Sequence, residues 1–561
     1  MPDRSSENIA DRATDAILGA NLLARYEPSK FLLSGARIAV RSATRPRLLA
    51  KHGLNLTAKL ATIAAGKSNI DLSADRRFND PAWEGNPVFR RLGQTYSAVA
   101  ESTRALMSEV PLDPAERARV DFAAEMALSA MAPTNFLATN PAALKKAFDT
   151  GGRSLARGAK HALEDLISNG GMPSMVDSSG FKIGENIVTT PGSVVHRTDV
   201  LELIQYRPTT SSVRQLPLII VPPQINKYYF LDLTHDRSMV QYALARGVQV
   251  FMISWKNPGP KQRDWDLDRY VKEVIAAMDV VAEITRIERV NLLGTCAGGL
   301  TAAATLGHLS EVGDDRIASA TFLVTGFDLS RPSLVRTVAG EDVVAAAIRR
   351  SQRKGVLKGK ELAKVFAWLR PDDLVWNYWV NNYLLGNDPA AFDILAWNND
   401  YTNMPAGLHH DYLTMWTDNS LMGSDLLTVA GTPIDLERIT TDVYVMGAST
   451  DHIIPWQSCY NGARRFGGDT KFVRSNSGHI QAQVNPPGNP KASYSVGEDL
   501  PENPDEWLEG SERIAGTWWD HWVDWLGARS GRKVRPRSRL GSATYPPLED
   551  APGTYVLEPA P

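Results

Sequence analysis

The chain of 561 residues contains little cysteine, with only Cys296 and Cys459. A disulfide framework is therefore not expected, and a reducing cytoplasm suits the chain better than an oxidising compartment. The sequence also lacks a charge excess, because 61 basic and 63 acidic side chains leave a formal net charge of −2. No global positive field favours a nucleic acid, so we expect none among the partners.

Long hydrophobic runs are missing as well. No uninterrupted apolar stretch approaches about 18 residues, so the sequence predicts no membrane-spanning helix. The first residues, MPDRSSENIADRATDA, are polar and charged and lack the apolar centre of a secretory signal. Histidine, cysteine and acidic residues form no compact cluster, which predicts no metal site. Together these features indicate a cytoplasmic protein.

The first 170 residues carry the periodicity of α-helices. Segments such as QTYSAVAESTRALMSEV (94–110) place apolar residues three and four positions apart. From Lys30 to Lys67 there are eight basic residues and no acidic one. This basic stretch predicts either a solvated helical face or a surface that adsorbs to an anionic or lipid-coated particle.

A segment rich in glycine, serine and proline, from Ser168 to Ser193, predicts a domain boundary. We place a helical N-terminal domain at 1–190 and a catalytic domain at 191–561. In the second domain, helical patterns separate short apolar runs rich in Val, Ile and Leu. The runs are LPLIIVPP, VQVFMISW, RVNLLGTC and ASATFLVTGFD. This alternation is typical of an α/β fold whose parallel sheet is covered on both faces.

The alternation of strands and helices stops from about residue 329 to about residue 435, where the sequence pattern is helical and rich in aromatic residues. Strand patterns resume with DVYVMGAST and DTKFVRSNS. An insertion at this place predicts a cap over the site, and its aromatic content suits a site that excludes water. In the tail, four tryptophans at helical spacing are expected to dock into the core. They are Trp518, Trp519, Trp522 and Trp525.

The motif Gly294-Thr295-Cys296-Ala297-Gly298 follows an apolar strand and precedes a helical pattern. This is the cysteine form of the nucleophile elbow of α/β-hydrolase folds, in which a sharp turn presents the nucleophile. A sulfur at a helix N-terminus is favoured as the thiolate, and the N–H of Ala297 is placed to donate to an oxyanion. We therefore predict Cys296 as the nucleophile and interpret Cys459, inside a helical pattern, as structural.

The fold orders the partners as nucleophile, acid and histidine. Asp451 follows one late strand, and His479 follows the next in the sequence Ser-Gly-His. Of ten histidines, only His452 and His479 lie near such strand ends. We predict that His479 removes the proton from Cys296 and that Asp451 orients the imidazolium. The alternative for Asp451 is a helix N-cap, a role that is compatible with the catalytic one. For His452 we expect supporting hydrogen bonds.

A cysteine nucleophile suits a thioester substrate, because the attack exchanges one thioester for another and keeps the acyl group activated. A second, alcohol-bearing acyl group can then attack the acyl-cysteine and form an ester, provided that water is excluded. The predicted triad alone fits both a transferase and a hydrolase.

Several stretches, in order along the chain, resemble the polyhydroxyalkanoate synthases. They are APTNFLATNPAAL, PPQINKYYFLDL, NLLGTCAGGLTAA, KVFAWLRPDDLVWNYWVNNYLLGN, AWNNDYTNMP, GASTDHIIPW, SGHIQAQVNPP and YPPLEDAPGTYVLEP. The cap motifs are most similar to those of members that accept medium-chain monomers. The resemblance implies an α/β-hydrolase fold with a helical cap, preceded by the helical domain.

The resemblance also implies roles for individual residues. Cys296, Asp451 and His479 match the family's triad, in which one proposal has the aspartate activate the monomer hydroxyl. Ile225 would supply the second oxyanion N–H. Asp232, Arg370 and Trp397 fall in motif blocks near the substrate entrance or channel. We predict that these three residues and His452 bind substrate.

As a member of this family, the protein would act on (R)-3-hydroxyacyl-CoA and extend a polyester chain. It would work as a homodimer on cytoplasmic polyester granules, beside granule-associated proteins. It would need no metal and no cofactor, because coenzyme A is part of the substrate. The N-terminal domain would support the granule surface or the dimer. The alternatives are a thioesterase or intracellular polyester depolymerase of the same fold, and a granule-coat protein without activity.

Overall fold

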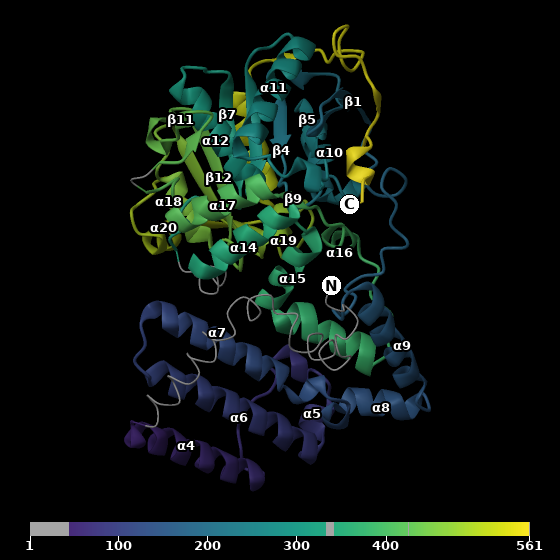
Figure 1. Ribbon diagram of the computed structural model, residues 1–561, viewed down its shortest axis with the longest axis vertical. Helices are drawn as coiled ribbons and strands as arrows, with labels where there is room; N and C mark the ends of the chain where they lie inside the picture. Colours follow the sequence, from purple (N-terminus) through teal and green to yellow (C-terminus); the bar gives the residue numbers. More distant parts are fainter. Residues whose placement is uncertain (1–43, 332–340, 424–425, 560–561) are drawn as a thin grey trace, which may run out of the picture. The chain divides into compact units, whose positions relative to one another are not determined.

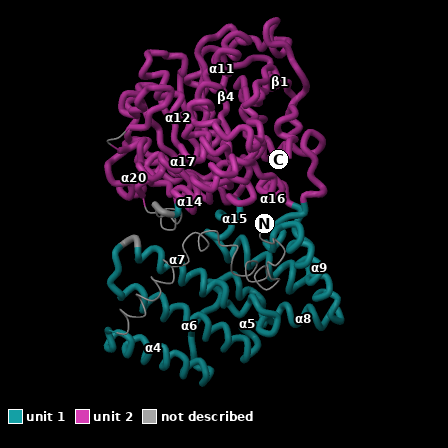
Figure 2. Tube along the Cα trace, in the orientation of Figure 1, with its two compact units in different colours: residues 1–177, 334–343, 363–391 teal, residues 178–333, 344–362, 392–561 magenta. Residues whose placement is uncertain are grey.

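The computed structural model describes residues 44–331, 341–423 and 426–559. The chain forms two compact units, coloured separately in Figure 2. Unit 1 comprises residues 1–177, 334–343 and 363–391, and unit 2 comprises 178–333, 344–362 and 392–561. Residues 363–391 of the predicted cap thus group with the N-terminal helices. The predicted division of roles at residue 190 stays a prediction.

Unit 1 is helical. Its helices are α4 (Pro46–Ala64), α5 (Ala82–Gly85), α6 (Pro87–Glu109), α7 (Pro114–Ala130), α8 (Pro141–Asp149) and α9 (Arg153–Ser168). Asn86 and Asn140 cap α6 and α8, because each side-chain oxygen accepts a backbone N–H of the first turn. In both helices proline takes the first position, where its missing N–H has no cost.

Part of the predicted basic stretch lies in α4, while residues 30–43 fall outside the described residues. Lys51 Nζ lies 2.7 Å from Glu109, and Lys59 Nζ lies 2.7 Å from Glu101, both on α6. These exposed ion pairs are worth little in stability. They neutralise two of the cations that an anionic surface would otherwise attract.

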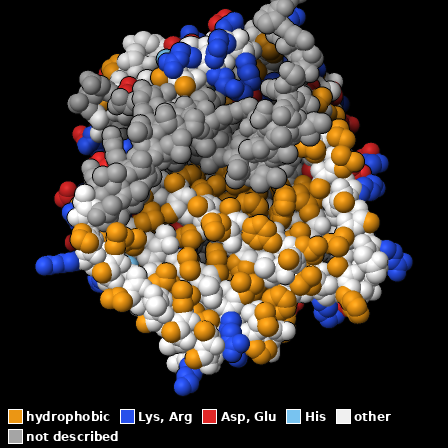
Figure 3. Space-filling view, turned by 60° about the horizontal axis from the view of Figure 1, so that its bottom comes forward, with side chains coloured by type: hydrophobic (Ala, Val, Ile, Leu, Met, Phe, Trp, Pro, Cys, Tyr) orange, Lys and Arg blue, Asp and Glu red, His pale blue; other side chains and the backbone are white. Residues whose placement is uncertain are grey.

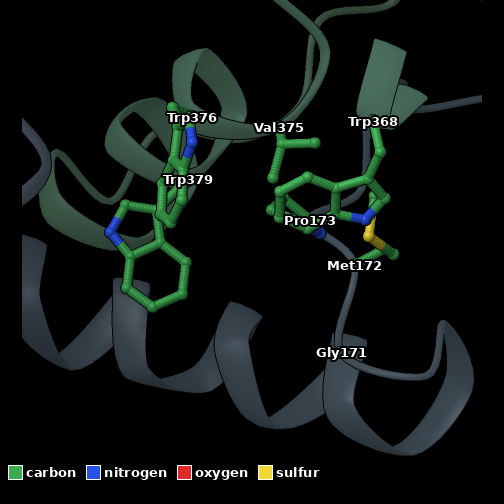
Figure 4. A pocket seen from close by; sticks show the side chains of 7 residues that line it. All are labelled: Gly171, Met172, Pro173, Trp368, Val375, Trp376 and Trp379. Carbon is green, nitrogen blue, oxygen red and sulfur yellow. The ribbon is translucent and has the colours of Figure 1, made fainter. Parts of the chain in front are cut away.

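The aromatic part of unit 1 forms π-helical turns, η7 (Asp372–Trp376) and η8 (Trp379–Leu384). Figure 4 shows a small pocket here, with Trp376 and Trp379 on one side and Val375 and Trp368 on the other. The indole N–H groups of Trp368 and Trp376 are buried without a hydrogen-bond partner. The lining residues carry no nucleophile, acid or base, so this pocket is not a candidate for catalysis.

Unit 2 is built on a sheet of eleven strands, ordered β15-β14-β13-β12-β7-β6-β4-β5-β2-β1-β17. Its centre is parallel, as predicted: β4 (Leu218–Val221), β5 (Val250–Trp255), β6 (Val290–Thr295), β7 (Ile317–Leu323), β12 (Asp442–Ala448) and β13 (Thr470–Ser475). Antiparallel strands extend both edges: β14 (Ser493–Val496), β15 (Glu512–Ala515), β2 (Leu201–Tyr206), β1 (Gly192–Arg197) and β17 (Glu549–Asp550).

The central strands bury both faces, because successive side chains point to opposite sides. In β4, Ile219 and Val221 join one hydrophobic core, whereas Leu218 and Ile220 join the other. Helices α11 (Leu267–Thr285), α12 (Ala297–Glu311) and α18 (Trp456–Ala463) pack into the first core. Helices α10 (Met239–Ala245), labelled beside β5 in Figure 1, and α21 (Trp518–Arg529) pack into the second core. The sheet is therefore a rigid platform for groups at its strand ends.

The insertion between β7 and β12 is mostly helical, as predicted. Its elements are α14 (Glu341–Lys354), β8 (Val356–Leu357), α15 (Gly359–Leu369), the turns η7 and η8, α16 (Asp393–Asn398), β9 (Met404–Pro405), α17 (Ala406–Asp418), β10 (Thr428–Val429) and β11 (Thr432–Pro433). The remaining short elements include α19 (His479–Gln483) and α20 (Pro504–Gly510). Within the described part of the chain, no helix combines the length and hydropathy that crossing a membrane requires.

Candidate active site

Cys296 occupies the sharp turn between β6 and α12. Its backbone has φ 52° and ψ −123°, a conformation that side chains rarely adopt. The turn is held because Cys296 N–H donates to Leu323 O at 2.8 Å and Cys296 O accepts from Gly299 N–H at 3.0 Å. Strain of this kind persists where the surrounding structure enforces it, and it presents the sulfur at the end of the sheet. The thiol is partly buried.

The glycines of the motif are required by close backbone packing. A Cβ on Gly294 would lie 2.7 Å from the Cβ of Ala302 and 2.7 Å from the Cα of Gly299. A Cβ on Gly298 would collide with the main-chain oxygens of Val221 and Pro222. Helix α12 can therefore approach the loop after β4 only because Gly298 has no side chain.

The predicted base and acid lie together after β13 and β12. His479 Nδ1 is 2.6 Å from Asp451 Oδ2, and both side chains are almost fully buried. The other oxygen, Asp451 Oδ1, accepts the backbone N–H groups of Ile453 and Ile454 at 2.8 and 3.0 Å. The two loops are joined directly, since Thr450 N–H donates to Ser477 O at 3.0 Å.

The environment of His479 favours the charged imidazolium. Burial lowers the pKa of His479, but the charges of Asp451 and Cys296, and hydrogen bonds to both, raise that pKa well above its ordinary value. The interaction with Cys296 connects the histidine to the nucleophile. Because the first ring nitrogen is engaged by Asp451, the second is left to exchange a proton with sulfur.

Helix α19, which begins at His479, is held in place by side chains of helix α21. Trp518 Nε1 donates to Ala482 O at 2.7 Å, and Trp519 Nε1 donates to Gln483 O at 3.0 Å. The Gln483 side chain accepts from Thr295 Oγ1 and donates to His479 O at 3.1 Å. The predicted core-docking tryptophans thus also position the histidine, and Gln483 ties it to the residue before Cys296.

The predicted oxyanion donors come from two segments. Ala297 is the first residue of α12, where a backbone N–H has no partner inside the helix. Ile225 is partly buried in the loop after β4, which packs against the start of α12 through Pro222 and Gly298.

The loop after β4 is also fixed at its far end. Lys227 Nζ donates to Val556 O at 2.6 Å and to Glu558 O at 3.1 Å, and lies 2.9 Å from Asp400. Trp397 Nε1 donates to Lys227 O at 2.7 Å. Residues far apart in sequence therefore hold this loop in place.

The four residues predicted to bind substrate lie in different surroundings. Asp232 is buried and accepts hydrogen bonds from Thr190, Tyr206 and Ser238 at 2.5, 3.0 and 2.6 Å. Burial raises the pKa of Asp232 to about 6, although these hydrogen bonds oppose the shift. These contacts give Asp232 a structural role, and its predicted contact with substrate stays a prediction.

The other three residues predicted to bind substrate, Trp397, Arg370 and His452, also lie in separate surroundings. Trp397 is buried, with its ring 5.0 Å from that of Phe230. Arg370 belongs to unit 1, where it pairs with Asp373. His452 is partly buried beside Asp451. Their roles toward substrate stay predictions. Among the described residues, no group of three or more potential ligands could hold a metal ion.

A cysteine on a strand–turn–helix elbow, with an acid and a histidine after two later strands, is the arrangement of the α/β-hydrolase fold. Residues 217–486 match the family described as the alpha/beta hydrolase fold. Residues 74–243 match the family described as the N-terminus of poly-beta-hydroxybutyrate polymerase.

Relatives extend the match over the whole chain. Poly(3-hydroxyalkanoate) polymerase 1 of Ectopseudomonas oleovorans is 46% identical over 560 residues, 100% of both chains. Polymerase 2 of that organism is 47% identical over 94% of each chain. The polymerase subunit of Cupriavidus necator is 38% identical over 86% of this chain and 83% of its own. The chain belongs to the poly(3-hydroxyalkanoate) polymerase family.

Proposed function

We propose that this protein is an acyltransferase that polymerises (R)-3-hydroxyacyl groups, delivered as CoA thioesters, into polyhydroxyalkanoate with release of CoA. Full-length similarity to a relative named as a polymerase supports this function. The observation that carries the chemistry is the buried bond of 2.6 Å between His479 and Asp451, at the strand end beside the Cys296 elbow. No metal or cofactor enters the proposed reaction.

In the acylation step, His479 takes the proton from the Cys296 thiol. The sulfur then attacks the thioester carbonyl carbon, and the N–H groups of Ala297 and Ile225 stabilise the negative charge on the carbonyl oxygen. The bond from carbon to the CoA sulfur breaks, and the departing thiolate receives the proton from His479. One thioester replaces another, so the acyl group stays activated.

In the elongation step, the hydroxyl of one acyl group attacks the acyl-cysteine of the chain. An ester bond forms, the Cys296 sulfur leaves, and the hydroxyl proton passes through His479. Both oxygens of Asp451 are already engaged, one by His479 and the other by two backbone N–H groups. This supports an Asp451 that orients the histidine over one that activates the hydroxyl.

The test compares wild type with Cys296→Ala on (R)-3-hydroxybutyryl-CoA and (R)-3-hydroxyoctanoyl-CoA. We expect CoA release and polymer from wild type and neither from the variant, with the faster substrate defining the monomer class. Cys459→Ala is the matched control, because this second thiol is fully buried in α18. Free hydroxy acid without polymer would indicate a thioesterase or depolymerase, and CoA release by Cys296→Ala would refute the nucleophile.

We propose that the protein works on polyester granules in the cytoplasm, as a homodimer. Exposed hydrophobic side chains of unit 1 support the association with a polyester surface, since Phe148 and Ile167 are 88% and 77% exposed. Figure 3 shows hydrophobic side chains gathered over much of the face that it presents. Co-sedimentation with polyester particles tests the association, and light scattering of the free protein tests the dimer.

A further inference from the structure

A closed ring of hydrogen bonds joins three side chains of unit 2. Gln224 Nε2 donates to Thr301 Oγ1 at 2.9 Å, and Tyr412 Oη donates to Gln224 Oε1 at 2.9 Å. Tyr412 Oη also lies 2.9 Å from Thr301 Oγ1. Because the Gln224 amide nitrogen donates to Thr301 and the Gln224 amide oxygen accepts from Tyr412, the Thr301 hydroxyl proton is left to donate to Tyr412 Oη. The reverse amide orientation would reverse the ring without opening it.

The ring connects the two segments that carry the proposed oxyanion donors. Gln224 precedes Ile225 in the loop after β4, and Thr301 lies about one turn after Ala297 in α12. Tyr412 comes from α17 in the insertion. Its hydroxyl also donates to Ala297 O at 2.9 Å, so the proton is shared between the loop and the helix.

The ring is buried and lies close to the nucleophile. Gln224 and Thr301 are 2% and 0% exposed, so a lost partner would leave a buried polar group unsatisfied. Burial raises the pKa of Tyr412; the hydrogen bond from Thr301 opposes the shift and the charge of Cys296 adds to it. The phenol therefore stays a neutral donor at physiological pH, within electrostatic reach of the sulfur.

We propose that Tyr412 is a positioning residue, which sets the spacing between the Ile225 and Ala297 N–H groups through Gln224 and Thr301. The inference rests on the proposed acylation of Cys296. It gives α17 a task beyond covering the sheet, because a hydroxyl of the insertion completes the frame of the oxyanion hole. The contribution is to the rate of acylation, since the oxyanion exists only in the tetrahedral state.

The experiment measures the first turnover of CoA release by rapid quench, together with KM and Tm. Tyr412→Phe and Thr301→Val each remove one hydroxyl of the ring with little change of shape. We expect each to slow acylation about tenfold or more while KM changes less than about twofold. Thr301→Ser, which keeps the hydroxyl, should recover most of the lost rate. The double variant should be no slower than the slower single one, because either change opens the same ring.

Thr305→Val is the matched control for a lost buried hydroxyl on α12. Thr305 Oγ1 donates to Thr301 O at 2.8 Å, a bond within the helix that does not reach the loop. This variant should lose a comparable amount of Tm and keep the acylation rate. Acylation that falls in proportion to Tm in all variants, Thr305→Val included, would overturn the positioning role.

Wild type and Cys296→Ala run in parallel separate the two proposals. Equal CoA release from these two proteins refutes the proposed function and the positioning role that rests on it. A burst that depends on Cys296 and that Tyr412→Phe and Thr301→Val leave unchanged refutes the positioning role alone.

Discussion

Units 1 and 2 treat their hydrophobic side chains differently. Among the described residues, fifteen large hydrophobic side chains are exposed, and eleven of them belong to unit 1, although it has fewer residues than unit 2. In unit 2, two cores fill both faces of the sheet. Unit 2, which carries the candidate active site, keeps most of its large hydrophobic side chains in its two cores, whereas unit 1 leaves more of them exposed, and exposed apolar patches are typical of interaction surfaces.

The largest effect on activity should come from a tightly packed glycine of unit 2, compared with an open glycine of unit 1. Gly298→Ala in unit 2 places a Cβ against the main-chain oxygens of Val221 and Pro222, which cannot turn away as a side chain can. We expect at least about 10⁴-fold slower CoA release, since the elbow and the oxyanion loop move together. The control is Gly85→Ala at the end of α5 in unit 1, where no atom lies within 4 Å. That change should leave activity intact and raise Tm slightly.

Asp451→Asn should have the next largest effect. Asparagine keeps the shape of the side chain but removes the charge that raises the pKa of His479. Acylation should fall about 10⁴-fold, as expected for a triad acid, and the protonation midpoint of His479 should move to lower pH. Asp469→Asn, which removes a carboxylate paired with Arg529, should leave the pH profile of CoA release unchanged.

The same pair predicts the sign of a pH effect on stability. A histidine whose folded pKa is raised contributes stability that is complete below its ordinary pKa of about 6.5 and is lost as pH rises through the folded value. The difference in unfolding free energy between wild type and Asp451→Asn should therefore shrink as pH rises from about 6. A difference that grows with pH would contradict a raised pKa for His479.

Two tryptophans test whether aromatic side chains are used differently in the units. Trp518 in unit 2 donates to Ala482 O, whereas the buried N–H of Trp376 in unit 1 has no partner. Trp518→Phe should cost about 1–3 kcal/mol more than Trp376→Phe, because it leaves a buried carbonyl unsatisfied. Hydrogen exchange reports on each unit separately, and equal losses of protection would contradict the distinction.

The smallest effect on stability should come from the exposed side chains. Phe148→Ser together with Ile167→Ser should change the unfolding free energy by less than about 1 kcal/mol. The double variant should bind polyester particles about tenfold more weakly, because two hydrophobic side chains are no longer buried against the particle. Val312→Ser, at a residue 58% exposed in unit 2, is the control and should bind the particles like wild type.

Local patterns made much of unit 2 predictable from the sequence. The parallel strand β4 is a run of Leu, Ile and Val, the other five parallel strands are short apolar or alternating stretches between helical patterns, and the turn at Cys296 needs only neighbouring residues. The antiparallel edges were not predicted, because β17 has two residues and β15 alternates weakly. The proximity of His479 to Asp451 followed from fold order, whereas their roles in catalysis stay predictions.

Support between distant segments left no sequence signal. Tyr412 lies 188 residues from Gln224, and an aromatic helix of this composition gives no sign of which hydroxyl turns toward α12. Residues 363–391 share their aromatic character with the rest of the insertion, so composition did not separate them from it. Only Gln483, four residues after His479, has a helical spacing that could have indicated a supporting contact.

The support of Lys227 by Val556 has a consequence for the order of events during synthesis. The two residues are 329 positions apart, which the ribosome needs roughly 15–65 s to translate. A nascent chain thus displays Cys296 well before the loop carrying Ile225 receives its last anchor. The loop that carries Ile225 can therefore acquire its contacts with Val556 and Glu558 only at the very end of synthesis, after the strands of the sheet have been made.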